Sequence, residues 1–151
     1  MEQWKSVDEI LDFAIGQEEE SVQFYTYLAG RVERPWMSEI FKQFSREEQG
    51  HKRKLQEIKF GKRLLPAQEK ILDLKIGDYL VEAVPSAEMD YQQALVLAMK
   101  KEKRSFLMYT NLADATDDQE LKQTFQALAQ EEAKHKLRFE VEYDDHVMTD
   151  N

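Results

Sequence analysis

The stretch FKQFSREEQGHKRKL at residues 41–55 decides the fold, because it recurs as FQALAQEEAKHKLRF at residues 125–139. A second pair repeats with the same offset of 84 residues: AIGQEEESVQFYTYLAG (14–30) and AMKKEKRSFLMYTNLAD (98–114). In all four stretches apolar residues recur every three or four positions, which is typical of a buried helix face. A gap-free repeat of this kind predicts two similar helical hairpins that are related by a pseudo-two-fold axis.

Helical periodicity and terminus signals predict four long helices, at about residues 7–33, 36–60, 86–113 and 117–143. Ser6 followed by Glu9 is typical of a capping box at the start of the first helix. The last helix is expected to start at Asp117 or Asp118, where Asp117 and Glu120 form a similar pair. The acidic end of the chain is expected to fray.

Short turns within each pair of helices predict two antiparallel hairpins, hairpin one at about 6–61 and hairpin two at about 86–145. Residues 62–85 join them, and their Ile and Leu content predicts that this long crossover packs against the body. A crossover of this length lets the second hairpin return alongside the first in the opposite sense. We therefore expect an all-α four-helix bundle that forms a single domain over residues 1–151.

The composition excludes several classes of function. The formal net charge of −9 argues against nucleic acid as a partner, because a phosphate backbone would repel the protein. No apolar run is long enough to span a bilayer and no secretory signal precedes the first helix, so we expect a cytoplasmic protein without a membrane partner. The chain has 0 cysteines, so any metal must be held by carboxylate and imidazole groups.

Two Glu-x-x-His motifs, Glu48 with His51 and Glu132 with His135, stand at matching positions of the repeat. Residues three apart lie on one face of a helix, so each motif presents a carboxylate and an imidazole to a single point. A single motif of this type is more often part of a solvated helix face. Two matched copies, each on a helix face whose other residues are apolar, indicate a metal site instead.

Glu18 and Glu102 add one more carboxylate from the other helix of each hairpin. The acidic neighbours of Glu18 at positions 19 and 20 are paired by the repeat with cations, which favours Glu18. Burying four carboxylates is very costly unless two divalent cations neutralise them, and oxygen and nitrogen donors without sulfur suit iron, manganese or a mixture. The expected metal ligands are Glu18, Glu48, His51, Glu102, Glu132 and His135.

Tyr25 and Tyr109 lie two turns after Glu18 and Glu102 and therefore share their helix faces. A buried tyrosine usually finds a hydrogen-bond partner, and a ligand carboxylate is a natural one. Plain aromatic packing in the core is the alternative. We expect both hydroxyls to contact the ligands and so to support catalysis.

Three other ionisable residues near the motifs are not expected to bind metal. Glu47 and Glu131 fall off the core-facing stripe and are expected to face solvent. His146 lies in the acidic tail and has no glutamate three residues before it.

The segments EEESVQFYTYLA (18–29) and IFKQFSREEQGHKRKL (40–55) resemble the first and second helices of the rubrerythrins, which belong to the ferritin-like superfamily. The resemblance covers about residues 6–145 and implies a ferritin-like bundle with a di-iron centre. By that resemblance Glu18 and Glu102 are terminal carboxylate ligands. Glu48 and Glu132 are bridging carboxylates, and His51 and His135 are the nitrogen ligands.

Two features of familiar rubrerythrins are missing from the sequence. Without cysteine there is no rubredoxin domain to hold an electron-transfer iron, so the donor is expected to be another protein. Around Glu102 stand Lys101, Lys103 and Arg104, with no second carboxylate in place of the extra third-helix glutamate.

The resemblance implies a homodimeric oxidoreductase that acts in oxidative stress. It would reduce hydrogen peroxide or dioxygen with an external electron donor. A ferritin-like protein that oxidises Fe(II) for storage or transfer is the main alternative. Two further alternatives remain open: an oxygenase, and a purely structural bundle whose site is empty.

Overall fold

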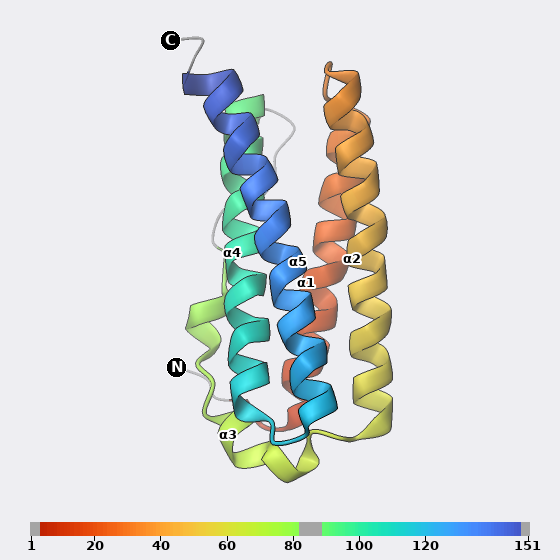
Figure 1. The fold of residues 1–151 in the computed structure, drawn as a ribbon, viewed down its shortest axis with the longest axis vertical. Helices are drawn as coiled ribbons and strands as arrows, with labels where there is room; N and C mark the ends of the chain where they lie inside the picture. The colour runs from red at the N-terminus through yellow and green to blue at the C-terminus, as the bar shows by residue number, and fades with distance from the viewer. Residues whose placement is uncertain (1–3, 82–88, 149–151) are drawn as a thin grey trace.

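The computed structural model describes residues 4–81 and 89–148, which form a bundle of four long helices (Figure 1). The long helices are α1 (Val7–Ala29), α2 (Pro35–Gly61), α4 (Tyr91–Ala115) and α5 (Gln119–Tyr143), and α3 (Gln68–Leu72) is a short one. The described residues contain no strand, so the predicted all-α class is confirmed. None of their helices is both long and apolar enough to cross a membrane.

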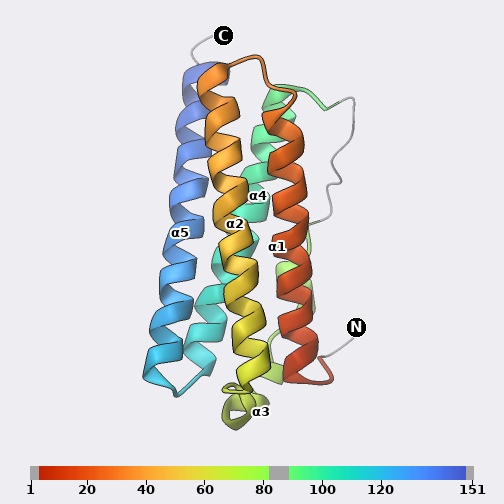
Figure 2. The same cartoon turned by 90° about the vertical axis from the view of Figure 1, so that its right-hand side faces the viewer.

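The two hairpins are α1 with α2 and α4 with α5, and each is antiparallel (Figure 1). Figure 2 shows α2 between α1 and α5, and α1 runs in the same direction as α5. The crossover leaves α2 at the end of the bundle where α3 lies, and α4 begins at the opposite end. This places α2 beside α5 and α1 beside α4, so residues from both hairpins face one interior.

Helix α1 begins as the sequence predicts, because the Ser6 Oγ accepts a hydrogen bond from the Glu9 N–H at 3.1 Å. It ends at Ala29 and not near residue 33, since the chain must turn before it enters the next helix at Pro35. Helix α2 ends with Gly61 as its last residue. The cap is Lys62, with φ 57 in the left-handed region.

Helix α4 begins at Tyr91, later than the predicted position 86, and residues 86–88 lie outside the described part of the chain. Asp90 caps it: its side chain accepts from the Gln93 N–H at 2.7 Å, and the Gln93 side chain accepts from the Asp90 N–H at 2.9 Å. This reciprocal capping box explains the later start.

Helix α5 begins after Asp118, whose side chain accepts a hydrogen bond from the Leu121 N–H at 3.0 Å. The predicted pairing of Asp117 with Glu120 is therefore not the cap. The predicted fraying is also wrong up to residue 148, because a π-helical turn, Asp144–Met148, continues the helix.

The apolar core is divided into two clusters along the bundle. The cluster nearer α3 includes Leu55 of α2, and the other includes Phe44 of the same helix. Glu48 and His51 lie between these two residues in the sequence. On α5, Glu132 and His135 likewise lie between residues of the two clusters. A polar layer therefore crosses the middle of the core.

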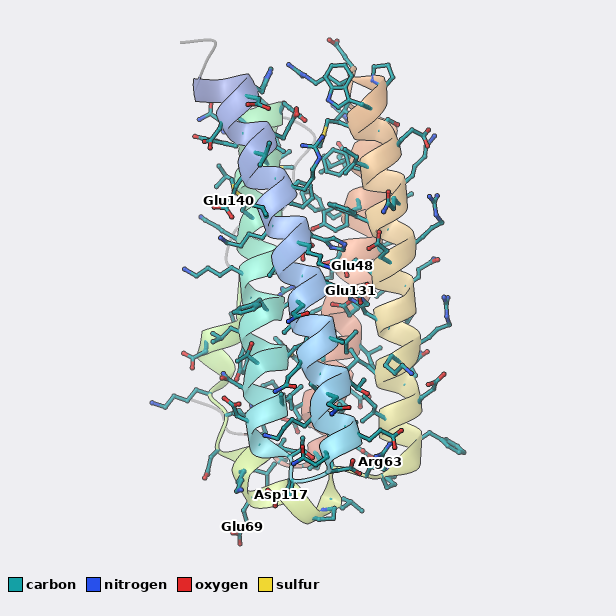
Figure 3. The ribbon with its side chains drawn as sticks, viewed as in Figure 1. Glu48, Arg63, Glu69, Asp117, Glu131 and Glu140 are labelled. Carbon is teal, nitrogen blue, oxygen red and sulfur yellow. The ribbon has the colours of Figure 1, made fainter. Side chains whose placement is uncertain are left out.

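The crossover packs against the bundle, as the sequence predicts. Ile71 of α3 is completely buried, and the Tyr79 hydroxyl accepts a hydrogen bond from the Asn111 side chain of α4 at 2.8 Å. At the same end the Arg63 guanidinium donates to the Asp118 carboxylate at 2.6 Å (Figure 3). Both hydrogen bonds connect the crossover with hairpin two, and α3 also packs against α1 of hairpin one.

Candidate metal centre

The six predicted metal ligands lie in the polar layer between the two apolar clusters. Each is at most 4% exposed. Figure 3 shows Glu48 about half-way along the bundle, near Glu131 of the neighbouring helix. Glu18 comes from α1, and Glu102 comes from α4. All four long helices therefore contribute to the layer.

The carboxylate and imidazole groups form two overlapping clusters, in each of which one donor atom per residue lies within 4.8 Å of the others. The first cluster is Glu18, Glu48, His51 and Glu132, and the second is Glu48, Glu102, Glu132 and His135. Glu48 and Glu132 belong to both. The structure thus brings all six predicted residues together, and it gives the shared position to the two glutamates that the family resemblance makes bridging ligands.

The Nδ1 atom of His51 faces the carboxylates. It lies 2.8 Å from Glu48 Oε1, 3.1 Å from Glu132 Oε1 and 3.3 Å from Glu18 Oε2. None of these contacts has hydrogen-bond geometry, so this nitrogen has no hydrogen-bond partner among the described residues. Its lone pair is available to a cation.

His135 has the same orientation on α5. Its Nδ1 lies 3.5 Å from Glu102 Oε1 and 3.8 Å from Glu132 Oε1. The Phe44 ring stacks on the imidazole with the ring centroids 3.8 Å apart. The apolar packing therefore fixes the ring plane that points Nδ1 into the layer.

The opposite nitrogen of each histidine contacts a carboxylate from the other hairpin. His51 Nε2 lies 3.0 Å from Glu131 Oε2, and His135 Nε2 lies 3.2 Å from Glu47 Oε1. The prediction that Glu47 and Glu131 only face solvent is therefore wrong. Both side chains stay partly exposed, but their carboxylates bend back across the α2–α5 interface and accept a hydrogen bond from an imidazole N–H.

The pattern of a single helix does not reveal these two glutamates, because each lies off the core-facing stripe of its own helix. The repeat contains the missing signal, since Glu47 and Glu131 are separated by the same offset of 84 residues as the ligands. A carboxylate that binds the outer nitrogen of a ligating histidine fixes its tautomer and makes it a better donor.

The tyrosine hydroxyls also reach across the hairpins. Tyr25 of α1 donates to Glu102 Oε1 of α4, and Tyr109 of α4 lies within the electrostatic influence of Glu18 of α1. Both side chains are buried. Burial, together with the charges of Glu102 and Glu18 respectively, raises the pKa of each phenol well above 10, so both remain protonated donors.

The polar layer contains buried oxygen and nitrogen atoms without hydrogen-bond partners, and these atoms are suited to binding two cations. Within the described residues neither oxygen of Glu48 or Glu132 has a hydrogen-bond partner, and one oxygen each of Glu18 and Glu102 also lacks one. Both histidine Nδ1 atoms belong to the same set. Buried polar atoms without partners are rare because they are costly. A pair of divalent cations held by these residues would satisfy them all.

The electrostatics agree with this interpretation. Burial and the charges of Glu102 and Glu18 raise the pKa of Glu132 to about 8. Burial and Glu132 raise the pKa of Glu48 well above its ordinary value. Burial alone would lower the pKa of His135, but the surrounding carboxylates raise it to about 9. The metal-free layer therefore retains protons that cations would displace.

Known proteins give evidence on both the fold and the family of the chain. No curated protein matches the chain. Among solved structures, the chain is similar to a protein from Thermotoga maritima described as a candidate ferritin-like diiron-carboxylate protein. The TM-score is 0.76 at 19% sequence identity, and the match covers 97% of this chain and 99% of the other. At that identity the likeness shows the ferritin-like fold.

A family model described as Rubrerythrin matches residues 9–143. Those residues include the whole polar layer and both Glu-x-x-His motifs. The buried cluster of glutamates and histidines suggests a binuclear metal site of the diiron-carboxylate kind. On this evidence the chain belongs to the rubrerythrin family.

Proposed function

We propose that the chain binds two iron ions and acts as an oxidoreductase that reduces hydrogen peroxide, or dioxygen, to water with electrons from an external donor. The proposed ligands are Glu18, Glu48, His51, Glu102, Glu132 and His135. The observation that carries the proposal is the pair of buried donor clusters that share Glu48 and Glu132.

The charge of the layer supports two divalent cations. Four carboxylates carry four negative charges, which two such ions neutralise, and the neutral imidazoles add no charge. Burial excludes bulk water, so an uncompensated set would be strongly unfavourable. Carboxylate oxygens together with imidazole nitrogens suit iron, and manganese is the main competitor.

When bound, the two iron ions would supply the two electrons that peroxide reduction requires. The side chains of the chain have the other tasks. Glu47 and Glu131 hold a proton on Nε2 of His135 and His51 and so leave each Nδ1 free to bind. The Tyr25 hydroxyl holds Glu102 in place through its hydrogen bond.

The test is rapid mixing of the anaerobic Fe(II)-loaded protein with peroxide, with dioxygen and with buffer. We expect two iron ions per chain and faster oxidation with peroxide than with buffer. Glu48→Ala and His135→Ala should lose iron and the reaction, whereas Glu140→Ala, at an exposed position of α5, should retain both.

The outcomes separate the candidate functions. Reoxidation by peroxide at the rate seen with buffer would contradict a peroxide reductase. Oxidation by dioxygen alone, followed by transfer of Fe(III) out of the site, would identify a ferroxidase. Protein that binds no iron under anaerobic conditions would contradict both.

A further inference from the structure

A pocket of about 330 Å³ lies between α4 and the crossover. Helix α4 lines it with Lys100, Lys103, Arg104 and Leu107, and the crossover contributes Asp78 and Leu80 among others. Arg104 follows Glu102 by two residues, which places the two side chains on nearly opposite sides of α4. The pocket is therefore separated from the metal centre by the body of this helix.

The α4 side of the pocket is positively charged. Lys100, Lys103 and Arg104 follow one another at helical spacing and share one face. Asp78 is the one acidic residue among those that line the pocket. In the part of the chain that the structure describes, no ion pair neutralises any of the three cations.

Arg104 is the unusual member of this set, because it is only 5% exposed. Its Nε and Nη2 atoms are buried and have no hydrogen-bond partner among the described residues. A buried guanidinium without partners is costly, so its native environment is expected to supply an acceptor. The repeat counterpart of Arg104 is Glu20, so this cation has no twin on α1.

The neighbouring carboxylates do not fill this role. Burial lowers the pKa of Arg104, and the charges of Glu18, Glu20 and Glu102 oppose that lowering. These carboxylates act from a distance, since none of them forms an ion pair with the guanidinium among the described residues. Nε and Nη2 of Arg104 thus lack an acceptor among the described residues, and the Arg104 side chain lines the pocket.

We propose that this pocket binds a small organic anion through a carboxylate or phosphate group that pairs with the Arg104 guanidinium. The planar fork of arginine binds two oxygens of such a group at once. The exposed Lys100 and Lys103 attract the anion, and Leu80 and Leu107 contact its apolar part. The volume lies at the small end of the range for ligand pockets.

The proposal is tested by calorimetric titration of the full-length protein with inorganic phosphate and with succinate, against chloride at equal ionic strength. Measurements on the protein as purified and after chelation separate this pocket from the metal centre. We expect binding that survives chelation and that Arg104→Gln weakens about 10- to 100-fold, as for a lost hydrogen bond to a charged group. Lys134→Gln, at an exposed lysine of α5, is the control and should leave binding unchanged.

The two probes distinguish the anion chemistry, because preference for one identifies the group that the pocket accepts. If Arg104→Gln does not fold, as judged by circular dichroism, Arg104→Lys and the double variant Lys100→Gln/Lys103→Gln replace it, and both should weaken binding. Absence of binding to the wild-type protein, or equal binding to all variants, overturns the proposal. Changed iron affinity without anion binding would make Arg104 a counter-charge of the metal centre and would also overturn it.

Discussion

Glu131 on α5 accepts a hydrogen bond from Nε2 of His51 on α2, at 3.0 Å. The same contact recurs, with the helices exchanged, between Glu47 and His135. Each imidazole is thus oriented by a carboxylate from the opposite hairpin. The contact keeps the proton on Nε2. The Nδ1 atom, which faces the polar layer, therefore keeps its electron pair for a metal.

We expect Glu131→Ala to weaken iron binding about 10- to 100-fold, because a lost partner of the outer nitrogen frees the ring to rotate and change tautomer. The affinity is measured by anaerobic competition with an Fe(II) chelator. Glu47→Ala should have a similar effect through His135.

Glu140→Ala is the matched control, since the Glu140 side chain is 47% exposed and that of Glu131 is 45% exposed, on the same helix (Figure 3). It should bind iron like the wild-type protein. Equal affinity of Glu131→Ala and Glu140→Ala would show that the contact with His51 does not position the ring.

Tyr25→Phe should lower the free energy of unfolding by about 1.5–3 kcal/mol, as for a lost hydrogen bond to a buried charged group. The hydroxyl that it removes donates to Glu102 within the core. Urea unfolding of the metal-free protein measures the change. In Tyr27→Phe the lost hydroxyl accepts a hydrogen bond from Arg31 at an exposed position, so that variant should change the free energy by less than about 0.5 kcal/mol. A similar value for both variants would contradict the role of Tyr25.

The metal-free protein should lose stability as the pH rises. The pKa of His135 is raised to about 9, so its contribution is complete below the ordinary value of 6.5 and disappears as the pH rises through 9. The pKa of Glu132 is raised to about 8, so the folded protein keeps a proton that the unfolded chain releases above 4.5. Both effects lower the free energy of unfolding between pH 6.5 and 8.

Metal should remove this dependence, because bound cations displace the same protons. Iron affinity should therefore increase over the pH range in which metal-free stability falls. Urea unfolding at several pH values, with and without metal, tests both trends. A metal-free protein that becomes more stable toward pH 8 would contradict the assignment of protons to the layer.

Ile71→Ala should destabilise the fold by about 2–5 kcal/mol, because it leaves a cavity under the crossover. Ile71 is completely buried, whereas Leu65, in the same segment, is 51% exposed. Leu65→Ala is therefore the control and should have a small effect in urea unfolding. Equal effects would mean that the crossover contributes little to the stability of the bundle.

The internal repeat made most of the site predictable from the sequence. It selected Glu18 over its acidic neighbours and paired each expected ligand with a counterpart, and the structure brings all six into two clusters. Helical periodicity likewise predicted the four long helices. The capping signal at Ser6 placed the start of α1 correctly, because that contact is local in the sequence.

The features that were missed depend on contacts between helices. Glu47 resembles a solvent-facing residue on its own helix, and its contact with His135 exists only because α5 packs beside α2. The late start of α4 has a local cause instead, the Asp90 capping box, because hydrophobic periodicity alone does not locate a helix terminus. The sequence gives no sign that Arg104 is buried, and its exposed fraction of 5% is known only from the folded bundle.

The shared position of Glu132 has a consequence for synthesis of the chain on the ribosome. Each of the two donor clusters contains Glu132, which α5 supplies, together with residues of α2. A nascent chain therefore presents no complete cluster until α5 has emerged. Tight capture of two metal ions would therefore wait for α5, and a product truncated before that helix would lack both complete clusters.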